Sequence, residues 1–473
     1  MGVKSQVDVT NFEEYAEKLI EQYQIPGTAL GIAYEGTPIY EKGFGYRNIK
    51  GELPVTMDTV FGIASVTKSF TCVAIMQLQE AGKLSVHDPV VKYLPEFTLK
   101  AGNAAKITIH HFMTHTAGLP PLPSLFYANK RSLEKDGSAK DYPGLNISAK
   151  EKEPIDTYEQ LMAFIGELDF ELLGEPGTVF SYSNDSYALL GTIIERVSGK
   201  KYEKYIKENI LEPIGMEHSC CLIEELEDYD NITTLYAQKE TKVYEAPVWW
   251  DSPAMRAAGY LKSTVHDMLK YAEIYRNNGK AGDKQILSAE SIKQMTHPHI
   301  ELTPGRFYGY GLVITPDYFG ATLVEHGGNL KAIASQLCII PERGITAMIL
   351  TNLAGVPAIT MMKAALNAIE GRDVEASPIP LDEYPVSAEE LADFAGTYTS
   401  NEGMKLTVTV LGSGLEFSSN GIVFPAQCIS KDSFIANVKD QSEVIRFIRD
   451  EIGKIVRVAY HFRQFPKDEA VKN

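Results

Sequence analysis

The sequence predicts an α/β fold in which a sheet adjoins a helical lobe, followed by a separate all-β module. Two observations lead to this prediction. Within residues 1–370, strand-like segments lie in the first and last thirds, and helical patterns fill the middle. After about residue 370, short strand-like segments follow one another at regular spacing. A chain of 473 residues is long enough for two or more domains.

The first elements are a helix and two strands. Apolar residues recur on one side of a helix over residues 12–23, and Pro26-Gly27 ends it. Residues 28–35 and 38–46 have the pattern of two strands joined by a tight turn. A more apolar helix is expected from about residue 64 to Gly82.

The middle of the chain is predicted to be mainly helical. Residues 121–155 are rich in Pro, Lys, Ser and Gly without periodicity, so we expect a long surface loop there. Helices are expected at residues 157–168, 185–198, 202–210, 264–277 and 288–295. Strands are expected at residues 308–315, 322–328, 335–342 and 346–353. The last three of these strands are apolar enough for central positions in a sheet.

The C-terminal part is predicted to be a small antiparallel barrel. Residues 375–385 are acidic and rich in proline, which is typical of a linker. We therefore expect a first domain at 1–372, a linker at 373–385 and a barrel domain at 386–473. The barrel strands are expected at residues 396–400, 405–412, 414–419, 421–429, 433–438, 443–450 and 454–462.

Charge and composition limit the partners. The net charge of -17 argues against nucleic acid or an anionic membrane surface, because both require a basic protein surface. No apolar run reaches the roughly 20 residues needed to span a bilayer, and residues 1–18 do not resemble a secretory signal. Five scattered cysteines fit reduced thiols in the cytoplasm, although a processed secreted form would have the same composition.

A serine and a lysine three residues apart open the apolar helix at residues 64–82. Ser65 and Lys68 would lie on neighbouring surface of its first turn. Burial and the positive end of the helix both favour a neutral lysine, which could take the serine proton. Alternatively, Ser65 caps the helix and Lys68 extends to solvent. The spacing alone leaves both interpretations open.

Two further segments place polar side chains beside turns. Tyr182 and Asn184 precede an apolar helix and could point into one cleft, or Asn184 could cap that helix while Tyr182 packs on the core. His326 precedes paired glycines at the end of a strand. Such glycines usually mark a bulge or a close approach by another backbone or a ligand, and an ordinary hairpin turn is the alternative.

These motifs carry a family resemblance. Ser65-Val66-Thr67-Lys68, Tyr182-Ser183-Asn184 and His326-Gly327-Gly328 occur in the order and rough spacing of the serine β-lactamase and penicillin-binding protein superfamily. The tyrosine version resembles class C β-lactamases, D-alanyl-D-alanine carboxypeptidases, D-aminopeptidases and related esterases of peptidase family S12. Residues 107–120 and 182–216 also resemble family segments. The resemblance implies an antiparallel β-lactamase-like sheet flanked by helices, and a lipocalin-like C-terminal domain.

The resemblance also implies roles for individual residues. Ser65 would be the nucleophile, and Lys68 and Tyr182 would share the acid and base work in an order that the sequence leaves open. Asn184 would orient Lys68 and bind the substrate amide. His326, Gly328 and Asn329 would belong to the substrate-binding strand. The backbone N–H groups of Ser65 and Asn329 would form the oxyanion hole.

His326 is a departure from the family pattern, because many β-lactamases have a lysine there. A histidine near its usual pKa of about 6.5 is only partly charged at pH 7. We therefore expect a peptidase acting on peptides that contain D-amino acids, of the D-aminopeptidase or DD-carboxypeptidase type. The alternatives are a carboxylesterase or weak β-lactamase, and a non-catalytic penicillin-binding or scaffold protein. Small peptides, esters or β-lactams would be the substrates.

No cofactor or metal is expected. The sequence has no phosphate loop, dinucleotide fingerprint or His-Glu-x-x-His motif. His110, His111 and His115 include one i, i+4 pair, but no carboxylate stands at a matching spacing. The C-terminal domain is expected to narrow the cleft or to join copies of the chain into a homo-oligomer.

Overall fold

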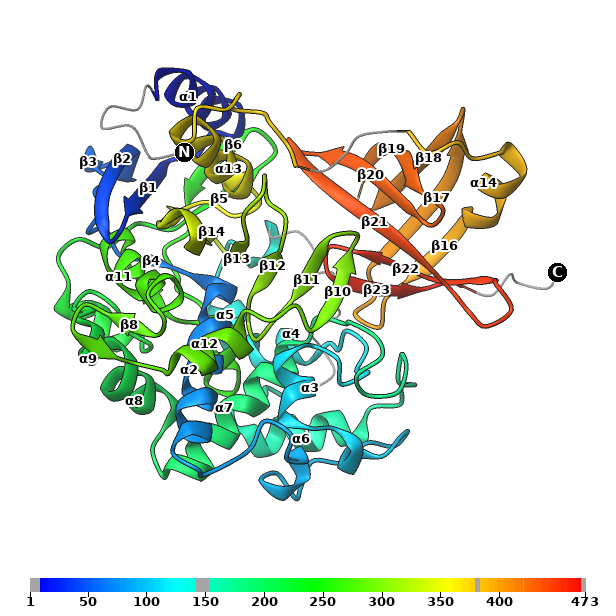
Figure 1. Ribbon diagram of the computed structural model, residues 1–473, viewed down its shortest axis with the longest axis horizontal. Helices are drawn as coiled ribbons and strands as arrows, with labels where there is room; N and C mark the ends of the chain where they lie inside the picture. The colour runs from blue at the N-terminus through cyan, green and yellow to red at the C-terminus, as the bar shows by residue number, and fades with distance from the viewer. Residues whose placement is uncertain (1–8, 142–152, 379–382, 420, 469–473) are drawn as a thin grey trace.

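The computed structural model describes residues 9–141, 153–378, 383–419 and 421–468, and its two large sheets share no strand. The first is a nine-stranded antiparallel sheet surrounded by helices, and the second is an eight-stranded barrel-like sheet at the C-terminal end (Figure 1). The predicted fold class is therefore confirmed. The predicted domain boundaries at residues 372 and 386 stay a prediction.

The nine-stranded sheet combines strands from residues 27–54 with strands from residues 300–351. We call residues 9–372 the N-terminal region. The strand order of the sheet is β10 (Ile300–Thr303), β11 (Arg306–Tyr308), β12 (Val313–Thr315), β13 (Leu323–Leu330), β14 (Ile333–Ile340), β15 (Ile345–Thr351), β1 (Gly27–Tyr34), β2 (Thr37–Asn48) and β3 (Leu53–Pro54). Strands β1 and β15 pair in the centre, with Leu30 opposite Ile349. Every residue of β14 and β15 is buried, which confirms the central positions predicted from their apolar runs.

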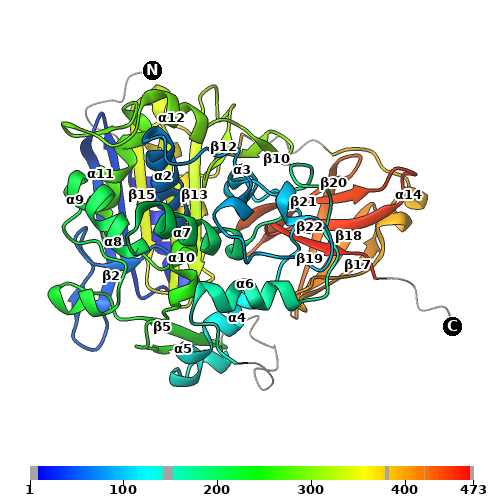
Figure 2. The ribbon, with the colours of Figure 1, turned by 90° about the horizontal axis from the view of Figure 1, so that it is seen from below.

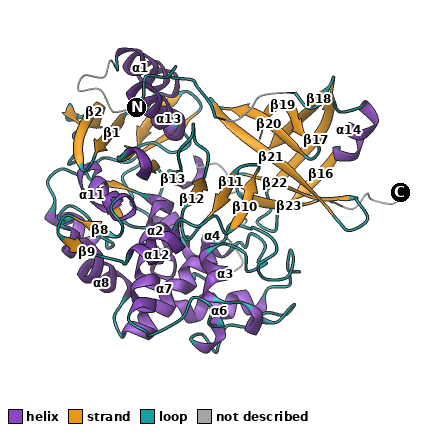
Figure 3. Ribbon diagram, viewed as in Figure 1, coloured by secondary structure: helices purple, strands orange, loops and turns teal. Residues whose placement is uncertain are grey.

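Helices cover both faces of this sheet. Helices α1 (Thr10–Tyr23) and α13 (Ala358–Ile369) pack on one face, through Phe12 and Met361 among others. Helix α11 (Val265–Arg276) packs on the opposite face, where the helical lobe begins. Figure 3 shows this lobe as a group of helices beside the sheet.

The lobe is built around α2 (Thr67–Glu80) and α7 (Asn184–Ser198). Its other helices are α3 (Ile109–Met113), α4 (Ser124–Ala128), α5 (Lys130–Lys135), α6 (Tyr158–Glu167), α8 (Tyr202–Ile206), α9 (Glu212–Ile214), α10 (Arg256–Gly259) and α12 (Ala289–Met295). Three two-stranded sheets complete it: β4 with β7 (Phe61–Gly62, Lys262–Ser263), β5 with β6 (Tyr236–Lys239, Lys242–Glu245) and β8 with β9 (Lys280–Ala281, Lys284–Gln285).

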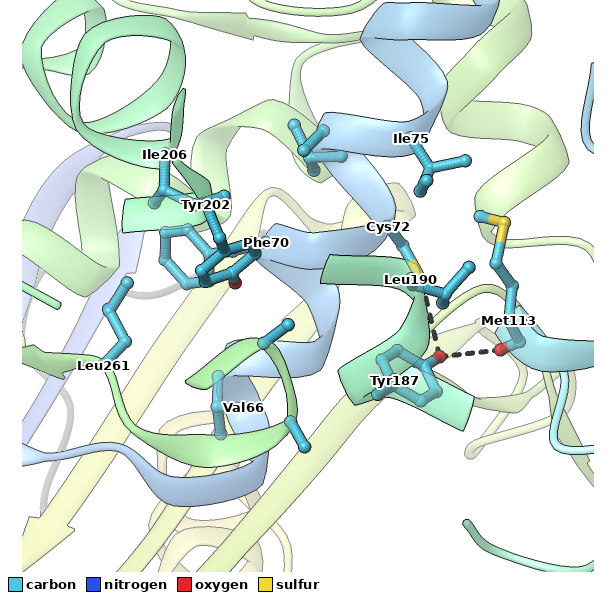
Figure 4. Packing of buried hydrophobic residues seen from close by; sticks show 14 of the residues in the cluster. Val66, Phe70, Cys72, Ile75, Met113, Tyr187, Leu190, Tyr202, Ile206 and Leu261 are labelled. Carbon is cyan, nitrogen blue, oxygen red and sulfur yellow. Dashed lines mark hydrogen bonds between the residues drawn. The ribbon is translucent and has the colours of Figure 1, made fainter. Parts of the chain in front are cut away.

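Helix α2 is buried on nearly all sides. Figure 4 shows Phe70, Cys72 and Ile75 of this helix packed among apolar side chains of the lobe, with Tyr187 of α7 close by. The Tyr187 hydroxyl donates to the Met113 carbonyl at 2.7 Å, so a polar group in this core is satisfied. Because α2 is surrounded, the residues at its N-terminal end are held rigidly.

The C-terminal sheet is an up-and-down arrangement of eight strands. They are β16 (Gly396–Thr399), β17 (Lys405–Leu411), β18 (Gly414–Ser419), β19 (Ile422–Ser430), β20 (Ser433–Val438), β21 (Gln441–Arg449), β22 (Ile455–Tyr460) and β23 (Arg463–Pro466). A bridge between Tyr398 and Lys467 brings the two ends of the sheet together. Helix α14 (Ala388–Phe394) packs against its interior through Leu391 and Phe394. We call residues 396–466 the C-terminal barrel.

The C-terminal barrel lies beside the N-terminal region in Figure 2, and two of its tight turns contact that region. At the β20–β21 turn, Asp440 accepts hydrogen bonds from Gln22 and Tyr23 of α1, each at 2.7 Å. At the β22–β23 turn, the carbonyl of Phe462 accepts from the backbone N–H of Tyr182 at 3.2 Å. The barrel therefore reaches a residue that the sequence motifs single out.

The prediction of a surface loop at residues 121–155 is wrong for its first part. Residues 124–128 and 130–135 are helical, and Phe126 and Tyr127 are each 8% exposed. These aromatic side chains pack into the main core, which compensates for weak local periodicity. Residues 142–152 of that segment lie outside the described residues.

Several elements were not predicted, among them α13, α14, β10, β11 and β23. Only residues 313–315 of the strand predicted at 308–315 belong to β12. All five cysteines are free and buried. Among the described residues, no helix combines the length and the apolar character needed to cross a bilayer.

Candidate active site

Ser65 lies in a tight turn immediately before α2. Residues Ala64–Val66 form one turn of 3-10 helix, and α2 continues from Thr67. Ala64 has a φ of 45°, a left-handed conformation that is strained for a residue with a side chain. The Ile63 carbonyl, just before it, accepts a hydrogen bond from the Ser335 hydroxyl of β14 at 2.9 Å. The sheet therefore helps to hold the serine turn in this conformation.

Lys68 is fully buried next to this serine. Its Nζ lies 3.2 Å from Ser65 Oγ, 2.9 Å from Asn184 Oδ1 and 2.6 Å from the Ala258 carbonyl. The side chain has no exposed surface, so the alternative in which Lys68 extends to solvent is wrong. The alternative role of Ser65 as a side-chain cap is also wrong, because no side-chain cap hydrogen bond forms at this end of the helix.

Burial strongly favours the neutral form of Lys68. Desolvation holds the pKa of this amine well below its usual value, and the charge of Arg463 lowers it further. A neutral amine can donate to Asn184 and Ala258 while its lone pair accepts the Ser65 proton. The three neighbours of Nζ therefore match what a general base for Ser65 requires.

Tyr182 and Asn184 approach the serine from the N-terminal end of α7. The residue that caps α7 is Ser183, whose hydroxyl accepts from the backbone N–H of Ser186, so the alternative in which Asn184 caps this helix is wrong. The amide of Asn184 is instead bonded to Lys68. Tyr182 is 8% exposed, and its ring centroid lies 4.8 Å from Lys68 Nζ.

The hydroxyl of Tyr182 also interacts with Ser65. Burial raises the pKa of Tyr182 to about 12, and hydrogen bonding with Ser65 and the charge of Arg463 counteract part of that rise. The tyrosine is therefore protonated at neutral pH and can donate a proton. Lys68 and Tyr182 thus both interact with Ser65. Burial favours the deprotonated amine of Lys68 and the protonated hydroxyl of Tyr182.

His326 is a neutral, fully bonded residue. Its Nδ1 lies 2.6 Å from the Gly327 carbonyl, so Nδ1 carries the proton, and Nε2 accepts from the Tyr308 hydroxyl at 3.0 Å. Burial and then the charge of Lys68 lower its pKa to about 4. The side chain is 4% exposed. This position therefore supplies no cation at neutral pH.

Gly328 lets β13 approach the serine turn. A Cβ atom at this glycine would lie 2.3 Å from the Ile63 carbonyl oxygen and 2.4 Å from Ser335 Oγ. The paired glycines thus serve close backbone approach, one of the two options that the sequence leaves open. Asn329 lies one residue further along β13 and is exposed. An oxyanion hole made by Ser65 and Asn329 stays a prediction.

Several residues of this site were not predicted. His115 packs behind Tyr182 with ring centroids 4.2 Å apart, and its Nδ1 accepts from the backbone N–H of Ser183 at 3.0 Å. Tyr308 holds His326, as described above. Phe462 and Arg463 come from the β22–β23 turn of the barrel, where no local pattern distinguishes them. Only the resemblance of residues 107–120 to a family segment indicated His115.

The histidines considered as metal ligands do not converge on one site. His115 belongs to the serine site, while the ring of His110 lies 5.1 Å from that of His299. Among the described residues, no group of three or more histidine, cysteine or acidic side chains is arranged to hold a metal ion. Trp250 donates to Asp136 at 2.7 Å and is buried.

Comparisons with known proteins agree with this geometry. A family model described as Beta-lactamase matches residues 12–369, which contain Ser65, Lys68, Tyr182 and His326. Protein flp of Staphylococcus aureus is 27% identical over 341 residues, which are 71% of this chain and 61% of that protein. The chain thus spans about 61% of the length of that relative.

Two other relatives are covered almost completely. Penicillin-binding protein 4 of Amycolatopsis lactamdurans is 26% identical over 410 residues, which are 84% of this chain and 99% of that protein. The octameric penicillin-binding protein homologue from Pyrococcus abyssi has a TM-score of 0.70 and is 31% identical. That match covers 97% of this chain and 100% of the homologue, so it includes the C-terminal barrel.

Proposed function

The chain belongs to the Beta-lactamase family, and we propose that within this family it is a serine hydrolase that acts through an acyl-enzyme. One observation carries this proposal: Lys68 is fully buried, and its Nζ lies 3.2 Å from Ser65 Oγ. Burial without a carboxylate partner favours the neutral amine, and a neutral amine at this distance can take the serine proton. Here its neighbours are a hydroxyl, an amide oxygen and a backbone carbonyl.

The proposed reaction has two halves. In the first, Ser65 Oγ attacks the substrate carbonyl, its proton passes to Lys68 or Tyr182, and the C–N or C–O bond of the substrate breaks. The leaving amine or alcohol takes a proton from the same pair of residues. In the second half, water adds to the acyl carbonyl, the ester bond to Ser65 breaks, and Ser65 regains its proton. The positions of Lys68 and Tyr182 support this exchange.

For the substrate, we propose a peptide that contains D-amino acids. The neutral His326 supports a peptidase over an efficient β-lactamase, because this position supplies no cation for the carboxylate of a lactam. A carboxylesterase or weak β-lactamase of the same fold is the second candidate. A non-catalytic penicillin-binding or scaffold protein is the third, and the presence of Ser65, Lys68 and Tyr182 together counts against it.

A panel of chromogenic substrates tests this ranking of the three candidate functions. D- and L-amino-acid p-nitroanilides, p-nitrophenyl esters and nitrocefin would be compared in one buffer, with Ser65→Ala as the control. We expect turnover of at least one D-amino-acid amide to exceed that of its L-isomer, and no turnover by Ser65→Ala. Nitrocefin turnover far above all the others would reverse the ordering, and equal rates in Ser65→Ala would reject the hydrolase proposal.

For the organisation of the molecule, we propose a hydrolase domain at residues 1–372 and a barrel domain at 386–473 that bounds the site and contributes to self-assembly. The contact of Phe462 with Tyr182 supports the first role. The octameric state of the similar protein from Pyrococcus abyssi supports the second.

A further inference from the structure

We propose that Arg463 of the C-terminal barrel binds a carboxylate on the leaving group of the substrate. The preferred substrates would then be peptides whose final residue leaves with a free α-carboxylate, so cleavage would be of the carboxypeptidase type. This inference rests on the hydrolase function proposed above and selects one class of substrate within it.

The β22–β23 turn brings Arg463 to the serine site. Tyr460 pairs with Arg463, so His461 and Phe462 form a two-residue turn. The Phe462 ring stacks on Tyr182 with centroids 6.0 Å apart, and Gln464 donates to the Phe180 carbonyl at 2.9 Å. The turn is therefore fixed against the loop that carries Tyr182.

The backbone of the β22–β23 turn is strained, and such strain is concentrated at functional sites in proteins. His461 and Phe462 have φ values of 47° and 61°, in a turn type that normally uses glycine or asparagine. Within the described ranges, the only other adjacent pair of non-glycine residues with positive φ is Lys439-Asp440, at the other turn that contacts the N-terminal region. Phe462 is nevertheless 41% exposed, so burial of its ring does not explain the strained turn.

A substrate carboxylate at this site would need a cation, and neither His326 nor Lys68 supplies one. His326 is neutral, and Lys68 is buried as an uncharged base. Two cations near β13 lie in ion pairs, as Arg463 does with Glu402. Arg306 lies 2.8 Å from Glu325, and Lys331 lies 2.5 Å from Asp136. Arg463 is the guanidinium whose charge acts on Lys68, Tyr182 and His115 together.

Arg463 has donors left for a ligand. Its Nε lies 3.2 Å from Glu402, and one terminal nitrogen lies 3.5 Å from the Tyr182 carbonyl. A guanidinium has five N–H donors in a planar fork, so its remaining donors can bind a carboxylate. The side chain is 20% exposed, which leaves it accessible at the edge of the site.

The position of Arg463 indicates which half of the substrate it meets. Its Cζ lies 5.3 Å from the ring of Tyr182, the protonated residue suited to supply the leaving group with a proton. A carboxylate near Arg463 would therefore belong to the departing residue rather than to the acyl group. Two linked carbons separate the amine and the carboxylate oxygens of an amino acid, which fits this short span.

The competing explanation is that Arg463 only fastens the barrel to the N-terminal region through the Tyr182 carbonyl, while Glu402 of the barrel holds its side chain in place. Both explanations predict that Arg463→Gln lowers stability. They differ in substrate preference, because a structural fastener would affect charged and uncharged leaving groups equally.

Paired esters test the proposal on the intact chain. The acetate esters of glycolate and glycolamide acylate serine with the same acetyl group, and they differ in the charge of a leaving alcohol whose carboxylate or amide stands two carbons from the leaving oxygen. After correction for spontaneous hydrolysis, we expect kcat/KM to favour the carboxylate ester by about tenfold, through a lower KM. The ratio should fall to about one in Arg463→Gln and to an intermediate value in Arg463→Lys.

Arg446→Gln is the matched control. Arg446 is another barrel arginine at the contact with the N-terminal region, 3.6 Å from Glu301. In Arg446→Gln, we expect the ratio of kcat/KM for the two esters to equal that of the wild type. A wild-type ratio of one or less would overturn the proposal, and this result needs no variant. An unchanged ratio in Arg463→Gln would overturn it as well.

A binding measurement separates this inference from the hydrolase proposal. In Ser65→Ala, we expect N-acetyl-D-alanyl-D-alanine to bind about tenfold more tightly than its C-terminal amide by calorimetry. Equal affinities, or no measurable binding of either peptide, would count against the role of Arg463. Failure of a fluorophosphonate, which has no carboxylate, to label Ser65 would instead count against the hydrolase function.

Discussion

Lys68 is the residue on which the proposed chemistry depends. An amine without exposed surface is costly to charge, and burial lowers its pKa well below the usual value. The same burial makes it a base at neutral pH, where an exposed lysine would be protonated. Burial therefore has two effects: it makes the charged amine costly, and it leaves the neutral amine available as a base.

Replacing Lys68 with Met keeps a side chain of similar length and removes the amine. We expect acylation of Ser65 by a fluorophosphonate to slow by about 10²-fold or more, because no base remains to take the serine proton. Because the neutral amine is the active form, the wild-type rate should fall as the pH drops through the lowered pKa. From pH 7 upward, the rate should be nearly flat. Labelling is followed by intact mass.

Lys262→Met is the control for this experiment. Lys262 is also buried, at 2% exposure, and its Nζ donates to the Cys221 carbonyl at 2.8 Å. We expect its labelling rate to match the wild type. A Lys68→Met variant that reacts at the wild-type rate, or a wild-type rate that climbs steadily toward pH 10, would contradict the assignment of Lys68 as base.

At the scale of elements, the site depends on how closely β13 approaches the turn before α2. Gly328 permits that approach, and Ser335 of β14 anchors the Ile63 carbonyl. Ala64 is held in a left-handed conformation between them and the helix. The position of Ser65 is thus set by contacts between elements that lie more than 200 residues apart in the sequence.

Gly328→Ala tests this arrangement. Its Cβ would lie 2.3 Å from the Ile63 oxygen, so either β13 or the serine turn must move. We expect the free energy of unfolding to fall by about 1–3 kcal/mol and acylation of Ser65 to slow. Urea denaturation and fluorophosphonate labelling measure the two effects.

Gly137→Ala serves as its control, since a Cβ at Gly137 would have no atom within 4 Å. It should leave both measurements near the wild-type values. Wild-type stability and labelling in Gly328→Ala would show that the close approach is not required.

Local sequence patterns predicted the helices that have a strong apolar periodicity or a clear signal for where the helix ends. The predictions for α1, α6, α7, α11 and α12 each agree with the structure within two residues at either end. The helices at residues 124–135 were missed, because packing of Phe126 and Tyr127 into the core stabilises them despite weak periodicity. Helix α13 followed a strand without a capping side chain, so its start had no local signal.

The site could be predicted only in part. Ser65, Lys68, Tyr182 and His326 lie in motifs with recognisable spacing, and the structure brings them together. Arg463 could not be predicted, because its approach to Tyr182 depends on how the barrel packs against the N-terminal region. Similarly, the neutral state of His326 follows from tertiary burial and from Tyr308, which lies 18 residues away.

At the scale of the whole molecule, the barrel and the helical lobe bound one site. The barrel contacts the N-terminal region at α1 and α13 through Asp440, and at the Tyr182 loop through Phe462. The first contact joins the β20–β21 turn to α1 and α13, while the second reaches Tyr182. Removing either contact would move Arg463 relative to the serine.

We expect the purified chain to form a homo-oligomer. The similar protein from Pyrococcus abyssi is an octamer, and the match to it includes the barrel. Light scattering coupled to a sizing column should therefore give a mass that is a multiple of the chain mass. A single monomeric peak at every concentration tested would contradict this expectation.

The most direct test of the account is to identify the residue that a fluorophosphonate modifies. Peptide mapping by mass spectrometry of the labelled chain should place one adduct on Ser65, and Ser65→Ala should remain unlabelled while folding normally. An adduct on another residue, or an unmodified Ser65 after prolonged exposure at neutral pH, would contradict the proposal that Lys68 and Tyr182 activate this serine.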